Sequence, residues 1–285
     1  MSDPTNPIIA LCFLTAGAIG VGSVCLRLAR NASAQGPPGI LPGKVETWYY
    51  RPLDLIGPVL ILGIFFGLFA LTLAMPDTSY KDLSAFALVF NIGLQGMIAG
   101  GAALIALRRT SLNTWLGLRW EHWPWLFLIA PTCVLLMWGV FWGIEVTGYI
   151  KWMESLGAET IQDTVKLFQE SNDIALIGLL AFTAVFVAPI CEEIVFRGLF
   201  YPVMKKFSGP WVAAVCSGLI FAAAHGNLTV LLPLFILGVL LVFVYEKTGS
   251  IWTPIAVHFC FNGVTVSIQL LMRLYKDLPI AHFSP

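Results

Sequence analysis

The sequence is poor in charged residues. Only 11% of its 285 residues are Asp, Glu, Lys or Arg, against about 25% in soluble domains. The formal net charge at pH 7 is zero, so nothing indicates nucleic acid or another polyanion as a partner. With 58% hydrophobic residues and a mean hydropathy of +0.83, this composition excludes an ordinary soluble domain. It indicates an integral, multi-pass membrane protein with the lipid bilayer as its surroundings.

Several signatures of metal-binding and transporter folds are also missing. The six cysteines form no CxxC pair. They lie in or near apolar stretches, which favours small buried side chains over a disulfide framework or a zinc ribbon. The sequence has no HExxH zinc motif. It also lacks the internal repeat that many transporter folds carry, which weakens a transporter interpretation.

Long apolar stretches make up most of the chain. A membrane span needs about 20 apolar residues, and this criterion predicts an all-α, polytopic membrane bundle of about eight helices. The candidate spans are residues 8–26, 53–75, 84–107, 125–147, 174–204, 209–225, 228–245 and 251–272. Although Ala32-Ser33-Ala34 resembles a cleavage site, the first span is too long for a signal peptide and no Lys or Arg precedes it. We expect it to be retained.

Charge and composition divide the chain into four parts. Residues 1–150 are predicted to be transmembrane scaffold helices, and 151–172 an acidic, amphipathic surface helix. Residues 173–273 are predicted to be the working part, and 274–285 a C-terminal tail. With the N-terminus outside, 11 of the 16 basic residues fall on the inner side. The positive-inside rule then predicts a cell (inner) membrane protein whose site opens to the cytoplasm.

Polar residues at membrane depth concentrate after residue 173. Glu192 and Glu193 interrupt one apolar stretch, and His225, His258 and Asn262 interrupt later ones. A charged group at that depth costs at least about 2–3 kcal/mol, so a compensating reason is expected. Counting about 1.5 Å of helical rise per residue from the inner turns places these groups at comparable depth. We therefore expect the helices to face one another around a shared site, with His258 and Asn262 on one helix face.

Spacing within the acid-bearing helix separates the two glutamates. Glu193 and Arg197 are four residues apart with the acid first, the favourable order for a helical ion pair. Glu192 is rotated by about 100° from Glu193 and is left to face the cavity as a base. Pro189 cannot donate a helix hydrogen bond, so a kink just before the acids and a freed carbonyl at Val185 are predicted.

Each element also has a simpler interpretation. The ion pair could serve helix packing, His225 could meet water at a helix end, and His258 with Asn262 could join helices by hydrogen bonds. Together these need three coincidences at one depth, which favours a functional site. The other polar residues in the spans are assigned to packing or interface roles: Asn91, Gln95, Glu145 and Gln269.

Three motifs occur in order over about residues 173–273: Glu192-Glu193-x-x-x-Arg197, Phe221-x-x-x-His225 and His258-x-x-x-Asn262. This set resembles the CPBP family of intramembrane proteases, which includes the CAAX prenyl protease 2 type and bacteriocin-processing or Abi-type membrane proteins. The resemblance implies a glutamate-type intramembrane endopeptidase with a catalytic core over residues 173–273. Its substrate would be a hydrophobic or lipid-anchored protein or peptide.

The resemblance also implies a role for each motif. Glu192 together with His225 would activate a water molecule, and His258 with Asn262 would stabilise the oxyanion. The remaining charged pair of the first motif would hold the first glutamate in place. These roles suit peptide hydrolysis, which needs a base and hydrogen-bond donors aimed at developing negative charge.

Three alternatives stay open. No cofactor is expected, but Glu192, His225 and His258 could instead hold zinc, as in a metalloprotease. A cysteine nucleophile is conceivable because Cys191 precedes Glu192 and Cys260 lies between His258 and Asn262. The constellation could also serve partner binding in a non-catalytic immunity, regulatory or scaffold protein.

Overall fold

The computed structural model describes residues 5–33, 43–74, 84–156, 158 and 163–276. Within these ranges every regular element is a helix, which confirms the all-α membrane bundle. Residues 34–42 and the part of the predicted C-terminal tail beyond residue 276 lie outside the described residues. The α-helices are α1 (Thr5–Ser33), α2 (Ile56–Ala74), α3 (Ala85–Leu107), α4 (Leu112–Leu116), α5 (Leu126–Val146), α6 (Tyr149–Ser155), α7 (Asp163–Glu170), α8 (Ile174–Phe182), α9 (Ala188–Glu193), α10 (Tyr201–Ser208), α11 (Pro210–Ala223), α12 (Leu228–Thr248) and α13 (Trp252–Lys276).

Seven helical segments among the described residues are long and apolar enough to cross a membrane. They are Pro7–Arg27, Pro52–Leu73, Ala85–Leu107, Trp123–Val146, Ile174–Ser208, Leu228–Thr248 and Trp252–Leu274. The remaining predicted span, 209–225, is the shorter apolar helix α11. At a rise of about 1.5 Å per residue its 14 residues cover about 21 Å, less than the roughly 30 Å hydrocarbon core. The turn after α11 therefore lies at membrane depth.

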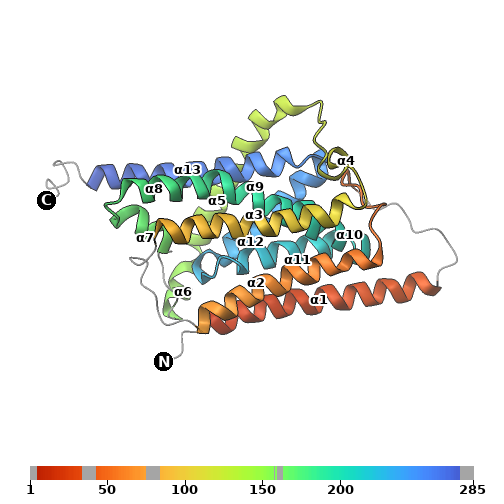
Figure 1. Ribbon diagram of the computed structural model, residues 1–285. Coiled ribbons are helices and arrows are strands. Elements are labelled where there is room, and N and C mark those ends of the chain that lie inside the picture. Colours follow the sequence, from red (N-terminus) through yellow and green to blue (C-terminus); the bar gives the residue numbers. More distant parts are fainter. Residues whose placement is uncertain (1–4, 34–42, 75–83, 157, 159–162, 277–285) are drawn as a thin grey trace.

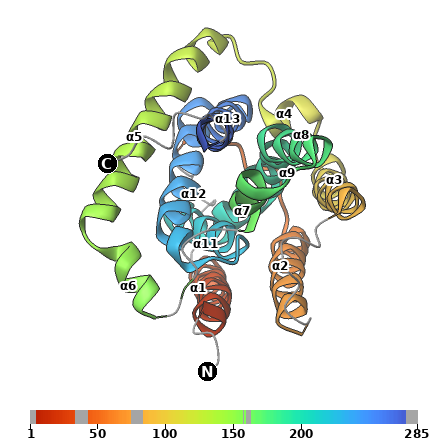
Figure 2. The same cartoon turned by 90° about the vertical axis from the view of Figure 1, so that its left-hand side faces the viewer.

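The helices run side by side, and the first helix begins at the same end of the bundle at which the last one ends (Figure 1). Seen along the bundle, α11 and α12 lie toward the middle (Figure 2). The helix α5 and the short α6 form an arc on the outside, while α3 lies beside α8 and α9 on the opposite flank (Figure 2). Helices from both halves of the chain thus enclose α11 and α12.

Local sequence signals explain where several helices begin and end. The side chains of Ser84, Asp173 and Asn227 accept hydrogen bonds from backbone N–H groups two or three residues later and so cap α3, α8 and α12. Gly249 adopts φ +73° just after α12, a conformation that glycine reaches without strain. These signals fix the hairpin of α12 and α13, on which part of the candidate site lies.

The predicted surface helix over 151–172 is not one continuous helix. Its described parts belong to two short helices, α6 and α7. The N–H of Ala158 bonds to the carbonyl oxygen of Met153 at 3.1 Å, a six-to-one bond that closes α6. The amphipathic part is α7, which buries Leu167 and Phe168 against α8 and α13.

The acid-bearing segment Ile174–Ser208 is a continuous helix interrupted by two π-helical stretches, η4 (Thr183–Val187) and η5 (Ile194–Phe200). The N–H of Ala188 bonds to Thr183 O, five residues back. Pro189 would bond to Ala184 O in the same register but has no N–H. The predicted irregularity before the acids is therefore a π-helical turn, and the carbonyl left open is that of Ala184 rather than Val185.

A second carbonyl of this helix accepts hydrogen bonds from outside the helix. Gly198 lies in η5, where the N–H of Tyr201 bonds to Phe196 O, five residues back. Trp115 Nε1 donates to the carbonyl oxygen of Gly198 at 2.6 Å, and Tyr50 Oη donates to it at 3.3 Å. Burial raises the pKa of Tyr50 well above its ordinary value, so its hydroxyl remains protonated. Side chains from the N-terminal half thereby satisfy the backbone of the acid-bearing helix.

Ionic contacts fasten the end of the bundle where α10 meets α11. The buried Lys205 Nζ lies 2.6 Å from Glu246 Oε1 and donates to Val45 O at 3.0 Å. Nearby, Arg109 Nε lies 3.1 Å from an oxygen of the buried Asp54. The Lys205 contacts join Val45 to α10 and α12, and the Arg109 contact joins two segments of the first half of the chain.

Candidate active site

The predicted ion pair forms and is completely buried. Arg197 Nη1 lies 3.0 Å from Glu193 Oε1, and neither side chain is exposed. Arg197 Nη2 also donates to the carbonyl oxygen of Gly238 on α12 at 2.9 Å. The pair therefore ties the acid-bearing helix to α12. Removal of either side chain would leave the other as a buried charge without a counter-charge, which is strongly destabilising.

His258 contacts both glutamates. Its Nδ1 lies 2.9 Å from Glu193 Oε1, the same oxygen that Arg197 contacts, and its Nε2 lies 3.9 Å from Glu192 Oε2. A carboxylate oxygen accepts, so Nδ1 carries the hydrogen in this contact. The ring is thereby oriented with Nε2 toward Glu192. Glu192 itself is partly exposed, while its Oε2 has no hydrogen-bond partner among the described residues.

Phe221 forms the apolar centre of the site. Its buried ring lies 4.8 Å from the guanidinium carbon of Arg197 and 5.0 and 5.7 Å from the rings of His225 and His258. The Phe221 carbonyl oxygen lies 2.8 Å from His225 Nδ1. Because a carbonyl oxygen only accepts, Nδ1 donates and the Nε2 lone pair of neutral His225 is left free. This contact accounts for the spacing of the second motif.

His225 lies in the turn between α11 and α12 rather than inside a helix. The helix α11 ends at Ala223, and Gly226 adopts φ +68°. A turn at membrane depth is tolerated where it lines a cavity, and His225 is exposed to two cavities. The predicted helix 209–225 therefore ends two residues early, which leaves the imidazole at a helix end facing polar space.

Asn262 approaches the acid-bearing helix from α13. Its Nδ2 donates to Ala184 O at 2.8 Å, the carbonyl that the π-helical turn and Pro189 leave open. One hydrogen of the amide nitrogen is used in this bond, and the second remains. Asn262 thus joins α13 to the helix that carries Glu192.

A cavity of about 910 Å³ lies where these elements meet. Glu192, His225, His258 and Asn262 all line it. Glu193 and Arg197 are buried behind it. The structure therefore brings all six predicted site residues into one region, four at the cavity wall and two beneath it.

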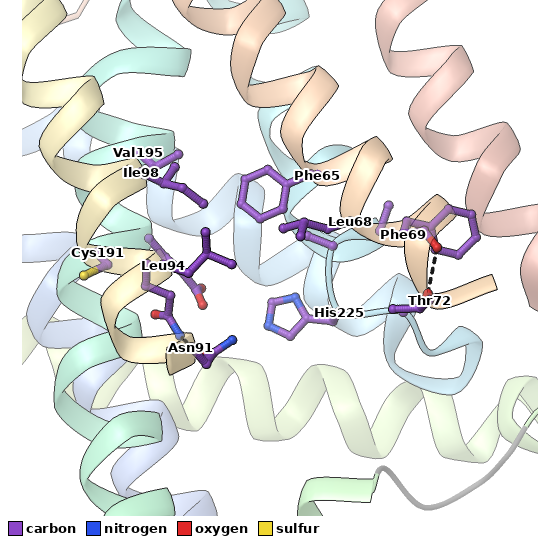
Figure 3. A pocket seen from close by; sticks show the side chains of 15 residues that line it. Phe65, Leu68, Phe69, Thr72, Asn91, Leu94, Ile98, Cys191, Val195 and His225 are labelled. Carbon is purple, nitrogen blue, oxygen red and sulfur yellow. Dashed lines mark hydrogen bonds between the residues drawn. The ribbon is translucent and has the colours of Figure 1, made fainter. Parts of the chain in front are cut away.

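A second cavity of about 330 Å³ lies between α2 and α3 (Figure 3). Aromatic and aliphatic side chains such as Phe65, Phe69 and Leu94 line it together with polar groups. Figure 3 shows Asn91 and His225 facing one another across it. Four residues line both cavities: Asn91, Gln95, Glu192 and His225.

The sequence analysis assigned Asn91 and Gln95 to packing or interface roles, whereas in the structure both residues line the two cavities. Gln95 Nε2 donates to Asn91 Oδ1 at 2.6 Å, so the two amides form a pair on α3. Two amides four residues apart on an apolar helix have the same spacing as His258 and Asn262. That repeated spacing is the signal that could have identified them. Gln269 also has a partner, since it accepts from Gln169 at 2.9 Å.

The side chains considered for other chemistries are placed differently. Within the described residues, no three His, Cys, Asp or Glu side chains come together in an arrangement that could hold a metal ion. Cys191 lines the smaller cavity, and Cys260 packs against the apolar core.

Residues 174–264 match the family of Rce1-like type II CAAX prenyl endopeptidases. Over 97 residues the chain is 32% identical to the Bacillus subtilis protein named "Putative membrane peptidase YdiL", covering 34% of this chain and 40% of that protein. Over 101 residues it is 30% identical to the Staphylococcus aureus "Membrane-embedded CAAX protease MroQ", covering 33% of this chain and 41% of that protein. It is also 31% identical over 98 residues to an uncharacterized 24.3 kDa protein of Escherichia coli, covering 33% and 45% of the two chains.

The chain thus spans less than half the length of these curated relatives. No solved structure matches it significantly. The matched segment contains all three motifs, and this confirms the resemblance predicted from them. Together with the seven apolar helices, the relatives support an integral, multi-pass membrane protein.

Proposed function

We propose that this protein is an intramembrane endopeptidase that hydrolyses a peptide bond of a hydrophobic or lipid-anchored protein or peptide. One observation carries the proposal. Glu192 on α9, His225 after α11, and His258 and Asn262 on α13 line one cavity of an apolar bundle. The segment that bears them matches an endopeptidase family. Ionisable side chains gathered at membrane depth are expected to serve function.

Glu192 and His225 are suited to activate water. Each presents an acceptor, a carboxylate oxygen and the free Nε2 lone pair, to the same cavities. A water held between them gives up a proton as its oxygen attacks the carbonyl carbon of the scissile bond. The carbonyl oxygen then carries the negative charge. The proton passes to the leaving nitrogen as the C–N bond breaks, which yields a carboxylate and an amine.

His258 and Asn262 are suited to stabilise the negative charge. Glu193 Oε1 accepts from His258 Nδ1, and this contact holds the ring with Nε2 toward the cavity. A hydrogen on Nε2 would serve as one donor to the developing negative charge, and the second hydrogen of Asn262 Nδ2 is another. The buried Glu193–Arg197 pair acts here by holding His258 and the acid-bearing helix in position.

We also propose that the site opens to the cytoplasm of a cell (inner) membrane. The ends of α10 and α12 and the start of α11 lie at one end of the bundle (Figure 1). Basic residues gather in the segments at this end, in the direction that the positive-inside rule expects for the cytoplasm. They include Lys44, Arg51, Arg108, Arg109, Lys205, Lys206 and Lys247.

The proposal is tested by mass spectrometry of protein termini in membrane fractions. Cells producing the wild type should contain new termini that are absent with Glu192→Gln and His225→Ala. Glu145→Gln serves as the matched control, because Glu145 is an exposed glutamate of α5 that lines neither cavity. New termini that persist with Glu192→Gln would overturn the assignment of the base. If cells producing the wild type contain no new termini, a non-catalytic, partner-binding role would explain the site better.

A further inference from the structure

The two cavities meet at only a few side chains, and all of them are polar. Of the residues that line each cavity, the shared ones are Asn91, Gln95, Glu192 and His225. The rest of the smaller cavity is mainly apolar, from α2 and α3. A substrate chain that extends from one cavity into the other must therefore pass between Asn91 and Gln95 on one side and Glu192 and His225 on the other.

The hydrogen bond between the two amides leaves complementary groups unused. Gln95 Nε2 donates to Asn91 Oδ1 at 2.6 Å, which occupies one donor of Gln95 and the acceptor of Asn91. Gln95 Oε1 is buried, and no donor among the described residues reaches it. Asn91 is exposed to the cavities, and its amino group keeps its hydrogens for another acceptor. The pair thus presents one free acceptor and one free donor.

We propose that Asn91 and Gln95 bind the main chain of the substrate opposite Glu192 and His225. Gln95 Oε1 accepts from a backbone N–H, and Asn91 Nδ2 donates to a backbone carbonyl. A peptide main chain supplies one such donor and one such acceptor per residue. This assignment rests on the proposed endopeptidase function and makes α3, from the predicted scaffold half, part of the substrate site.

An apolar occupant does not fit this junction. A lipid tail or an aliphatic side chain would leave the buried Gln95 Oε1 without a donor, at a cost of about 1–3 kcal/mol. A helical substrate does not fit either, since its backbone N–H groups are already bonded within the helix. The junction therefore selects an unwound, extended stretch of chain. The apolar parts of the substrate take the cavities on either side.

The test measures binding separately from cleavage. The probe is a fluorescent peptide that spans a cleavage site found by the comparison of protein termini, and its dissociation constant is measured by anisotropy in detergent. The protein is Glu192→Gln, with and without Gln95→Met. We expect Gln95→Met to weaken binding about 10-fold, as expected for one lost hydrogen bond to a buried group. Asn113→Leu is the control, because it removes an exposed amide of α4 outside both cavities.

Substituted probes identify the group that Gln95 contacts. In a set of peptides, each N–H around the cleavage site is replaced in turn by an ester oxygen. To the Glu192→Gln protein, one of these esters should bind about 10-fold more weakly than the unmodified peptide does. To the protein that also carries Gln95→Met, the same ester and the unmodified peptide should bind equally well. The proposal would be overturned if the two proteins bound the unmodified peptide with equal dissociation constants. It would also be overturned if each ester weakened binding by the same factor in both proteins.

Two further measurements separate this proposal from others. Gln95→Asn keeps the amide but shortens the side chain, and should also weaken binding if Gln95→Met does not fold. The thermal unfolding temperature of the Gln95 variants should match that of Asn113→Leu. If Gln95 had a merely structural role, its substitution would lower this temperature. Persistent cleavage by Glu192→Gln would refute the hydrolytic mechanism without affecting the binding result.

Discussion

Asn262 donates through Nδ2 to the carbonyl oxygen of Ala184, 2.8 Å away and 78 residues earlier in the chain. The carbonyl is available because Pro189 has no N–H for the π-helical turn that precedes Glu192. The asparagine of the third motif therefore supports the acid-bearing helix of the first motif. This contact adds a positioning role to the oxyanion role proposed for Asn262.

The first prediction concerns this contact. Asn262→Ala should lower the free energy of unfolding by about 1–3 kcal/mol, because Ala184 O loses its donor. In a Pro189→Ala background residue 189 regains an N–H five residues after Ala184, so the same change should cost less than about 1 kcal/mol. Thermal or denaturant unfolding in detergent measures both. Thr265→Val is the control, since within the described residues the Thr265 hydroxyl bonds to its own helix, at Phe261 O. Equal costs in the two backgrounds would contradict the prediction.

The second prediction concerns the buried ion pair. Arg197→Met should destabilise the protein by about 3–5 kcal/mol, because Glu193 would remain charged and buried without its partner. The double variant Arg197→Met/Glu193→Gln should recover part of this loss. Lys247→Met removes an exposed cation that covers the Phe243 ring at 5.3 Å, and should change stability by less than about 0.5 kcal/mol. Additive effects in the double variant would argue against direct coupling of the pair.

The third prediction concerns the packing of α11 on α12. A Cβ atom at Gly238 would lie 2.8 Å from the Cα atom of Gly218, so Gly238→Ala should push the helices apart. Because Gly238 O also accepts from Arg197, cleavage should fall together with thermal stability. At Gly139 of α5 a Cβ atom would meet nothing within 4 Å. Gly139→Ala should therefore be neutral or stabilising by up to about 1 kcal/mol; equal effects at the two positions would refute the packing argument.

The fourth prediction concerns metal dependence. Incubation of the purified protein with a zinc chelator should leave the cleavage rate unchanged, because no group of three His, Cys, Asp or Glu side chains that could hold a metal ion lies within the described residues. A known zinc endopeptidase treated in the same way provides the positive control. Loss of activity that added Zn²⁺ restores would revive the metalloprotease alternative.

The helices and the gathering of the site residues could be predicted from the sequence. Apolar stretches of span length stand out against a composition with so little charge, and polar side chains within them are costly enough to carry information. The four-residue spacing of Glu193 and Arg197 was sufficient to predict their ion pair, because it depends on helix geometry alone.

Features that depend on contacts between distant residues could not be predicted. The shift of the open carbonyl from Val185 to Ala184 arises from π-helical register, which no local pattern in the sequence specifies. The four-residue spacing of Asn91 and Gln95 marks them as a pair, but only the packing of α3 against α9 reveals their place beside Glu192. The prediction of one continuous helix over 151–172 was wrong, because α6 ends at Ser155 and the N–H of Ala158 bonds back to Met153 O.

The carbonyl of Gly198 illustrates how strongly the two halves of the chain depend on each other. Its donors, Tyr50 and Trp115, both precede the segment that matches the endopeptidase family. If residues 174–264 were transferred into a relative, this oxygen would lose both side-chain donors unless the relative supplied equivalent ones. The boundaries of a chimeric protein should accordingly be chosen so that hydrogen-bonded partners stay together, rather than at the limits of sequence similarity.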